Sequence, residues 1–284
     1  MGTGVAELAE DLERCWGRVC ALGLERNIAE LHALGYTTVP AALTASEVVE
    51  ARDRILELSD VAGAAKENYQ TYQSGLSFEL YHLVKQGRIF EQLLMNPQAL
   101  ALGYYLLGES MVLNNSLAYV KGRNPENLRL HCDSLMVPDP LPEYLHLANF
   151  TMTLTDYTLA GGCIGIVPGS HRYRRHPTAH EATDYSAMQP IECPAGTLIV
   201  IPGNTWHGAF PKSTDGLRVT LVQAFSRMYL APSVSHDIDP HILERNPEAF
   251  RRLLGAHLWT GYDERGLDLE KFAPSYRTQR SHFA

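Results

Sequence analysis

The stretch Asn149-Phe-Thr-Met-Thr-Leu154 decides the fold class, because polar and apolar side chains alternate along it. Such alternation predicts a half-buried β-strand with one polar and one apolar face. Polar groups on the inner face of a sheet usually line a site rather than a dry core, because burying them without partners is costly. We therefore expect Asn149, Thr151 and Thr153 to face a functional cavity.

Similar runs flank this stretch on both sides. The stretch itself belongs to a run over residues 144–155, and the flanking runs cover residues 112–120, 163–167, 197–201 and 218–225; Gly, Pro and Asn residues separate them. Repeated short strands with turn signals predict an antiparallel sandwich or barrel. The sequence thus indicates a mainly β fold between Met111 and Ser226, with helices packed beside it.

The flanking regions carry helical patterns. Apolar residues recur at helical spacing over residues 5–34 and stop at Gly35, and a short strand is expected over residues 36–39. Thr44 and Glu47 have the spacing of a capping box that opens the next helix. Further helices are expected over residues 89–107 and 247–254. Residues 64–87 are rich in aromatics without a period, which predicts a loop-rich, lid-like segment.

One domain accounts for all 284 residues. We expect residues 1–110 to be mostly helical with the lid-like segment, 111–226 to form the β core, and 227–284 to form a helical extension. The net charge of −8 argues against binding to nucleic acid, which needs a basic face. No apolar run is long enough to span a membrane, and the five scattered cysteines suggest free thiols. A cytoplasmic protein, monomeric or homodimeric, is the expectation.

The metal-binding pattern lies in Arg129-Leu-His-Cys-Asp-Ser134 and in Gly203-Asn-Thr-Trp-His-Gly-Ala-Phe210. In an extended chain, His131 and Asp133 project to one face while Cys132 points to the other. A rolled-up sheet could bring His207 to the same place. Two imidazoles and one carboxylate on one face of an octahedron suit Fe(II) and leave room for a chelating 2-oxo acid and for O₂.

Arg218 follows the second histidine at the distance of a hairpin turn and a returning strand. A guanidinium at that place could form a bidentate pair with a carboxylate, and Thr220 points the same way on that strand. Asn115 is a candidate for contact with the chelating carboxylate, although the pair Asn114-Asn115 leaves open which side chain points inward.

Simpler interpretations exist for each motif alone. A His-x-Asp pair in a strand often occurs by chance, and a histidine at a strand end is commonly just hydrogen-bonded. Their order, the strand-rich context and the arginine together favour a metal site. Two rival functions remain: a metal-dependent barrel enzyme of the isomerase type that works without 2-oxoglutarate, and a non-catalytic barrel that binds small molecules.

The sequence resembles the phytanoyl-CoA dioxygenase family of 2-oxoglutarate oxygenases. The resemblance covers most of the chain: Leu31-His-Ala-Leu-Gly-Tyr-Thr-Thr-Val39, His131-Cys-Asp133, the segment from Gly161 to His171 with its Pro-Gly-Ser-His end, Pro194-Ala-Gly-Thr-Leu198, Trp206-His-Gly208 and Arg218. It implies a double-stranded β-helix, a jelly-roll core of the cupin type. It also implies the metal triad His131, Asp133 and His207.

Two positions depart from the family pattern. Ala209 stands where members often have a hydroxyl residue, and Thr151 stands where some members place an aromatic side chain against 2-oxoglutarate. Halogenases that resemble this chain lack the carboxylate ligand. Because Asp133 fills that position, the resemblance implies oxygen insertion or desaturation rather than chlorination.

The resemblance also implies the reaction. A C–H bond of a small molecule would be oxidised, with hydroxylation as the expected outcome, and 2-oxoglutarate would be converted to succinate and CO₂. Aromatic and flexible apolar side chains of the lid-like segment and of the turn after Asp133 suit an apolar substrate, such as a terpenoid, a polyketide or an acyl derivative. These candidate substrate contacts are Tyr69, Tyr72, Tyr81, His82 and Met136. The same aromatics could instead fill the core beneath the helices.

Overall fold

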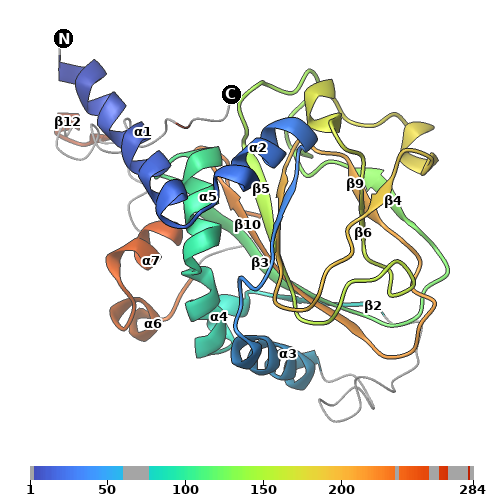
Figure 1. Cartoon of the computed structure of the whole chain (residues 1–284). Coiled ribbons are helices and arrows are strands. Elements are labelled where there is room, and N and C mark those ends of the chain that lie inside the picture. Colours follow the sequence, from blue (N-terminus) through green and yellow to red (C-terminus); the bar gives the residue numbers. More distant parts are fainter. Residues whose placement is uncertain (1–2, 60–76, 234–236, 256–261, 268–280, 282–284) are drawn as a thin grey trace.

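The computed structural model describes residues 3–59, 77–233, 237–255, 262–267 and 281 (Figure 1). The helices are α1 Thr3–Ala21, α2 Glu25–Leu34, α3 Ala45–Ser59, α4 Arg88–Leu94, α5 Pro97–Leu107, α6 Pro240–Glu244 and α7 Glu248–Leu253. The strands are β1 Thr37–Val39, β2 Ser77–Tyr81, β3 Val112–Lys121, β4 Leu128–His131, β5 Leu147–Thr153, β6 Ile164–Ile166, β7 Gln189–Pro190, β8 Leu198–Pro202, β9 His207–Ala209, β10 Arg218–Ser226, β11 Tyr262–Asp263 and β12 Gly266–Leu267.

Two antiparallel sheets form the centre of the molecule. The larger sheet has the strand order β1-β8-β5-β10-β3-β2, and the smaller has the order β4-β9-β6-β7. Strands that are neighbours in a sheet are far apart in sequence, as β5 and β10 are, so the chain crosses repeatedly from one sheet to the other. This arrangement is the jelly-roll, and the expected class of mainly β with packed helices is confirmed.

The helices cover the outer face of the larger sheet (Figure 1). Phe150 and Phe225 point toward them and pack edge to face, with ring centroids 5.2 Å apart. They belong to the main hydrophobic cluster, which joins buried residues from Val19 in α1 to Leu254 after α7. The helices and the larger sheet therefore share one core, and the polar face of the sheet is left for the other side.

The start of the chain folds as the pattern predicts. Gly35 ends α2 in the left-handed conformation, with φ of 78°. This conformation disfavours any residue with a Cβ. A Cβ at this position would also lie 2.3 Å from Nδ1 of His171, so glycine fits best. Thr44 and Glu47 form the capping box: the Thr44 backbone N–H donates to the Glu47 carboxylate at 2.8 Å, and the Glu47 N–H donates back to the Thr44 hydroxyl at 3.3 Å.

Three expectations about elements were wrong. Ser77–Tyr81 is not part of a loop but strand β2, which pairs with β3; its alternation was hidden among aromatic residues. The expected helix over residues 89–107 is two helices, because Asn96 caps α5 by accepting from the Ala99 N–H at 3.0 Å and Pro97 stands in the first turn. The short helix α6 was missed, since five residues are too few for a period to show.

A buried carboxylate ties the C-terminal helices to the core. Glu91 in α4 is fully buried and accepts from Arg88 at 2.6 Å, from Asn246 at 2.6 Å and from two nitrogens of the Arg245 guanidinium, Nε and Nη2. Burial raises the pKa of Glu91, but the hydrogen bonds from Arg245, Asn246 and Arg88 outweigh it and hold the pKa below its ordinary value. The charged form is thus the stabilised one.

Glu91→Gln is expected to lower the free energy of unfolding by about 2 kcal/mol at pH 7, because it removes charged hydrogen bonds whose arginine partners are half exposed. Urea unfolding would measure the loss. The stabilisation is fully present above the pKa of an unfolded glutamate and disappears as the pH falls through the folded pKa, so the two proteins should converge in acid. Exposed Glu126→Gln is the matched control. Equal urea midpoints for the wild type and Glu91→Gln at pH 7 would contradict this role.

Candidate metal centre

Two paired strands of the smaller sheet bring the predicted ligands together. His131 ends β4 and lies opposite His207, which begins β9. Nε2 of His131 is 3.7 Å from one oxygen of Asp133, and Nε2 of His207 is 3.4 Å from the other. One donor atom from each residue lies within 4.8 Å of the other two, so the three could hold a single ion. The His131 side chain is 33% exposed, which opens the cluster to small molecules on that side.

The backbone orients both imidazoles. Nδ1 of His131 lies 2.9 Å from the Arg129 carbonyl oxygen, and Nδ1 of His207 lies 3.0 Å from the Thr205 carbonyl oxygen. A carbonyl can only accept, so each Nδ1 carries the proton and each Nε2 presents a lone pair toward Asp133. Burial, and then the charge of His207, lowers the pKa of His131, which favours the neutral form that a metal requires.

Asn149 connects this cluster to the larger sheet. Its Nδ2 donates to the Asp133 carboxylate from β5, so the polar face of β5 does point at the site as expected. This bond orients the carboxylate in the way that partners of metal ligands usually do. Cys132 points the other way, as predicted: it is buried, with its sulfur 3.2 Å from Nδ1 of His176, and burial raises its thiol pKa to about 11.

Side chains that face the smaller sheet form rows across β3, β10 and β5. Residues opposite one another in an antiparallel pair project to the same face. From the start of β10 onward the rows are Lys121–Arg218, Tyr119–Thr220–Thr153, Leu117–Val222–Thr151 and Asn115–Ala224–Asn149. The last row contains Asn149, the partner of Asp133, so the predicted positions Arg218, Thr220, Thr151 and Asn115 lie on the face of the larger sheet that is turned toward the metal cluster.

Arg218 is a buried cation, 7% exposed. Its Nε has no hydrogen-bond partner, and within the described parts of the chain no carboxylate forms an ion pair with it. The guanidinium lies 5.3 Å from the ring centre of Tyr157, whose hydroxyl is 2.6 Å from the Thr220 hydroxyl. A buried charge without a counter-ion is costly, so this place fits a carboxylate that is supplied from outside the chain.

The structure settles the orientation of Asn115. The pairing of β10 with β3 shifts at Ala224 and Phe225, which leaves Asn114 as an extra residue. Asn114 turns its side chain to Ser226 and to Ser233, whereas Asn115 lies in the row of Asn149 with its buried Oδ1 unpaired. A ligand or a water molecule could donate to this buried acceptor.

Sequence reasoning missed two aromatic residues of this face, Tyr157 and Tyr119. Burial raises the pKa of the Tyr119 phenol, the charges of Glu79 and Asp133 raise it further, and Arg218 opposes them. Tyr119 therefore lies within electrostatic range of both the metal cluster and Arg218. Tyr119 is two residues before Lys121, so both side chains project to one face of β3. That this face also carries Thr220 and Arg218 follows only from the register between β3 and β10.

The expected substrate contacts are only partly placed. Tyr69 and Tyr72 lie outside the described residues. Tyr81 ends β2, is 46% exposed and donates to Glu79, while His82 follows it with φ of 59°. Met136 is 87% exposed in the turn after Asp133. Tyr81 pairs with Leu117, so it projects to the same face of the larger sheet as Thr151 and Val222. No described contact joins Tyr81, His82 or Met136 to the metal cluster, and their role as substrate contacts stays a prediction.

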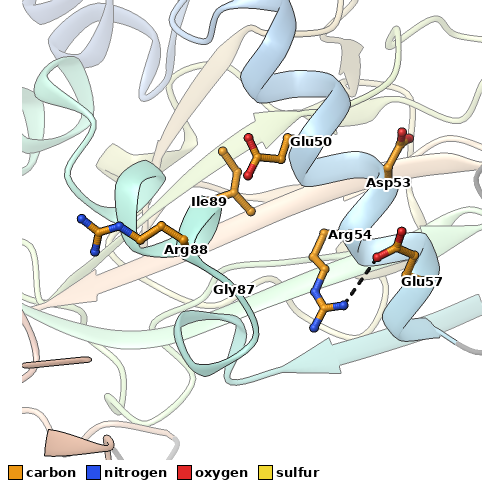
Figure 2. A pocket seen from close by; sticks show the side chains of 7 residues that line it. All are labelled: Glu50, Asp53, Arg54, Glu57, Gly87, Arg88 and Ile89. Atoms are coloured by element: carbon orange, nitrogen blue, oxygen red, sulfur yellow. Dashed lines mark hydrogen bonds and ion pairs between the residues drawn. The ribbon is translucent and has the colours of Figure 1, made fainter. Parts of the chain in front are cut away.

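A separate hollow lies on the helical side of the molecule. It has a volume of about 350 Å³ and is lined by α3 and by residues 87–89 (Figure 2). Arg54 forms an ion pair with Glu57 at 3.5 Å across its wall and donates to the Gln86 carbonyl oxygen. None of the predicted site residues that the structure describes lines this hollow. Among the helices that the structure describes, none is both long and apolar enough to cross a membrane.

Known proteins share this architecture. The family model of phytanoyl-CoA dioxygenase (PhyH) matches residues 31–220. A protein named dioxygenase af480 from Aspergillus fumigatus is 27% identical over 275 residues, which cover 93% of this chain and 86% of that protein. Among solved structures, the epimerase SnoN in complex with Fe³⁺, α-ketoglutarate and nogalamycin RO has a TM-score of 0.56 at 23% identity, covering 73% of this chain and 85% of SnoN. HygX from Streptomyces hygroscopicus, with nickel, 2-oxoglutarate and hygromycin B bound, has a TM-score of 0.59 at 15% identity, covering 78% and 94%.

Proposed function

The chain belongs to the phytanoyl-CoA dioxygenase family of iron- and 2-oxoglutarate-dependent enzymes, and from this membership we propose that it hydroxylates a C–H bond of an apolar small molecule. One observation supports the proposal most strongly: the face of the larger sheet that is turned toward the three metal-type donors also carries a buried guanidinium without a counter-ion among the described residues. A ligand with a chelating end and a distant carboxylate matches both groups.

We assign iron binding to His131, Asp133 and His207. The two imidazoles present their Nε2 atoms and Asp133 supplies the charge, a donor set that suits Fe(II) with open positions left for other ligands. Asn149 keeps the carboxylate in place by its hydrogen bond. These side chains form a preorganised metal site, so metal binding is proposed to need little rearrangement of the chain.

Arg218 is assigned to the far carboxylate of 2-oxoglutarate, with Thr220 beside it. The hydroxyl groups of Thr220 and Tyr157 lie together on the side of Arg218. They offer the hydroxyl group that Ala209 lacks. Asn115 and Thr151 are proposed to line the path between the two ends. The bound iron and cosubstrate supply the O₂-dependent oxidation, with release of succinate and CO₂, and the residues named here orient the reactants and exclude water.

The substrate is proposed to enter from the side of His131. Leu135 is 68% exposed and Met136 is 87% exposed in the turn that follows Asp133, so apolar surface lies next to the ligands. This supports an apolar compound such as a terpenoid, a polyketide or an acyl derivative. The complexes of SnoN with nogalamycin RO and of HygX with hygromycin B support a small-molecule substrate. We further propose that the chain acts as one domain, since the helices and the larger sheet share one core. A cytoplasmic location and a monomeric or homodimeric state stay predictions from the sequence.

An anaerobic titration tests the proposal. Adding 2-oxoglutarate to the Fe(II)-loaded protein should produce a weak visible charge-transfer band, because the keto acid chelates the metal. Succinate release on admission of O₂ should then increase with a suitable substrate. A barrel enzyme of the isomerase type that works without 2-oxoglutarate would give no band, and a non-catalytic carrier would release no succinate with any substrate tried. His131→Ala should remove the band, and its retention would overturn the ligand assignment.

A further inference from the structure

A second cation stands beside Arg218 on the same face. Lys121, the last residue of β3, lies directly opposite Arg218 in the β3–β10 pair, so their side chains project together toward the smaller sheet. The Lys121 ammonium lies 5.3 Å from the ring centre of Tyr119, on the same strand. The two basic side chains are therefore held by the register of the sheet.

The positive charges of Lys121 and Arg218 repel one another, because burial reduces their screening by solvent. Burial lowers the pKa of Lys121, the charge of Arg218 lowers it further, and Glu79 on β2 only partly opposes this. Within the described parts of the chain, neither Lys121 nor Arg218 forms an ion pair. Two like charges at this place destabilise the empty protein, and a bound anion would relieve the repulsion.

Lys212 shows that a buried lysine of this chain can be fully satisfied. It also lies near Arg218, yet its ammonium donates to the Thr214 carbonyl at 2.9 Å, to the Thr214 hydroxyl at 2.8 Å and to the Asp215 carbonyl at 3.0 Å. All three of its donors are used. Among the described residues, no hydrogen-bond acceptor is paired with the Lys121 ammonium, which lies over the face of the Tyr119 ring, so its donors are available to a ligand.

We propose that Lys121 is a second binding residue for the far carboxylate of 2-oxoglutarate and makes the site selective for a dicarboxylate. The inference rests on the proposed function, because it needs 2-oxoglutarate to lie between the metal cluster and β10. One carboxylate has two oxygens and about four acceptor positions, enough for the guanidinium and the ammonium together. A 2-oxo acid without a far carboxylate would leave both cations unpaired.

Lys121→Met tests this inference in the anaerobic titration. The Kd of the Fe(II)-loaded protein for 2-oxoglutarate, taken from the charge-transfer band, should rise roughly tenfold, because one charged hydrogen bond is lost. The band at saturation should keep its intensity. The Kd for 2-oxobutyrate, which chelates iron but has no far carboxylate, should stay the same. Lys121→Arg keeps the charge and should raise the Kd for 2-oxoglutarate less than Lys121→Met does.

Controls separate the possible failures. Exposed Lys85→Met removes the same charge elsewhere and should leave both Kd values unchanged. A wild type without any band would reject the proposed function itself. A wild-type band combined with an unchanged Kd for 2-oxoglutarate in Lys121→Met would reject only the role of Lys121. An equal rise for both keto acids would mean general distortion and would also reject it. Lys121→Gln serves the same test if the methionine variant does not fold.

Discussion

Replacing Arg218 with methionine is expected to raise the Kd for 2-oxoglutarate by more than about 100-fold, because a bidentate pair contributes two charged hydrogen bonds. The side chain is buried and its Nε is unpaired. The ammonium of Lys121 lies on the same face but cannot form the two-pronged contact of a guanidinium. Arg218→Lys keeps the charge but cannot form the two-pronged contact, and an intermediate Kd is expected. The charge-transfer titration gives all three values.

The same substitution has an opposite effect on the free protein. Without a ligand, the guanidinium is a buried charge beside Lys121 that lacks a counter-ion, so Arg218→Met should raise the urea midpoint of the metal-free protein. Arg26→Met on the exposed side of α2 is the matched control and should change neither property. Loss of cosubstrate affinity together with loss of stability would indicate a structural arginine. Unchanged affinity would show that Arg218 does not bind the far carboxylate of 2-oxoglutarate.

Replacing Asp133 with alanine is expected to weaken Fe(II) binding by more than the 10- to 100-fold that partners of metal ligands usually contribute, because Asp133 is assigned as a ligand itself. The variant loses the one negative charge of the cluster and also the acceptor of the Asn149 hydrogen bond. Wild-type protein should unfold at a higher temperature when Fe(II) is added under anaerobic conditions. The variant should lose most of that shift.

Two comparisons make the Asp133 result specific. Asp237→Ala removes one exposed carboxylate and should behave as wild type in both the metal-free and the Fe(II)-loaded state. Asp133→Asn keeps the shape of the side chain but not its charge, so its Fe(II) affinity should also fall sharply. A metal-dependent shift of wild-type size in Asp133→Ala would show that the ion binds at some other place.

Local spacing explains how much of the site could be predicted. His131 and Asp133 are two residues apart, so period-two geometry was enough to put them on one face. The strands of the core were predicted for the same reason, since polar and apolar residues alternate along β5 and β10. These inferences need only short stretches of chain. The expected hairpin between His207 and Arg218 was wrong, because β9 and β10 belong to different sheets and do not pair.

What was missed depends on contacts between distant strands. The bond from Asn149 to Asp133 joins the two sheets, and no local pattern shows how the sheets face each other. The pairing of Lys121 with Arg218 follows from the register of β3 with β10, which the extra residue Asn114 shifts. Strand β2 was predicted to be a loop. Its extended conformation depends on pairing with β3, and the alternation of its five residues cannot be told apart from the neighbouring aromatic residues.

Both imidazoles take their orientation from carbonyl groups two residues earlier in the same chain, at Arg129 and at Thr205. The proton position on each ring therefore does not depend on the identity of any other side chain. The residues that form the walls of the cavity can then be exchanged during evolution, or by an engineer, without disturbing the ring geometry at the metal. A scaffold with this property can acquire new substrates by changing its walls alone.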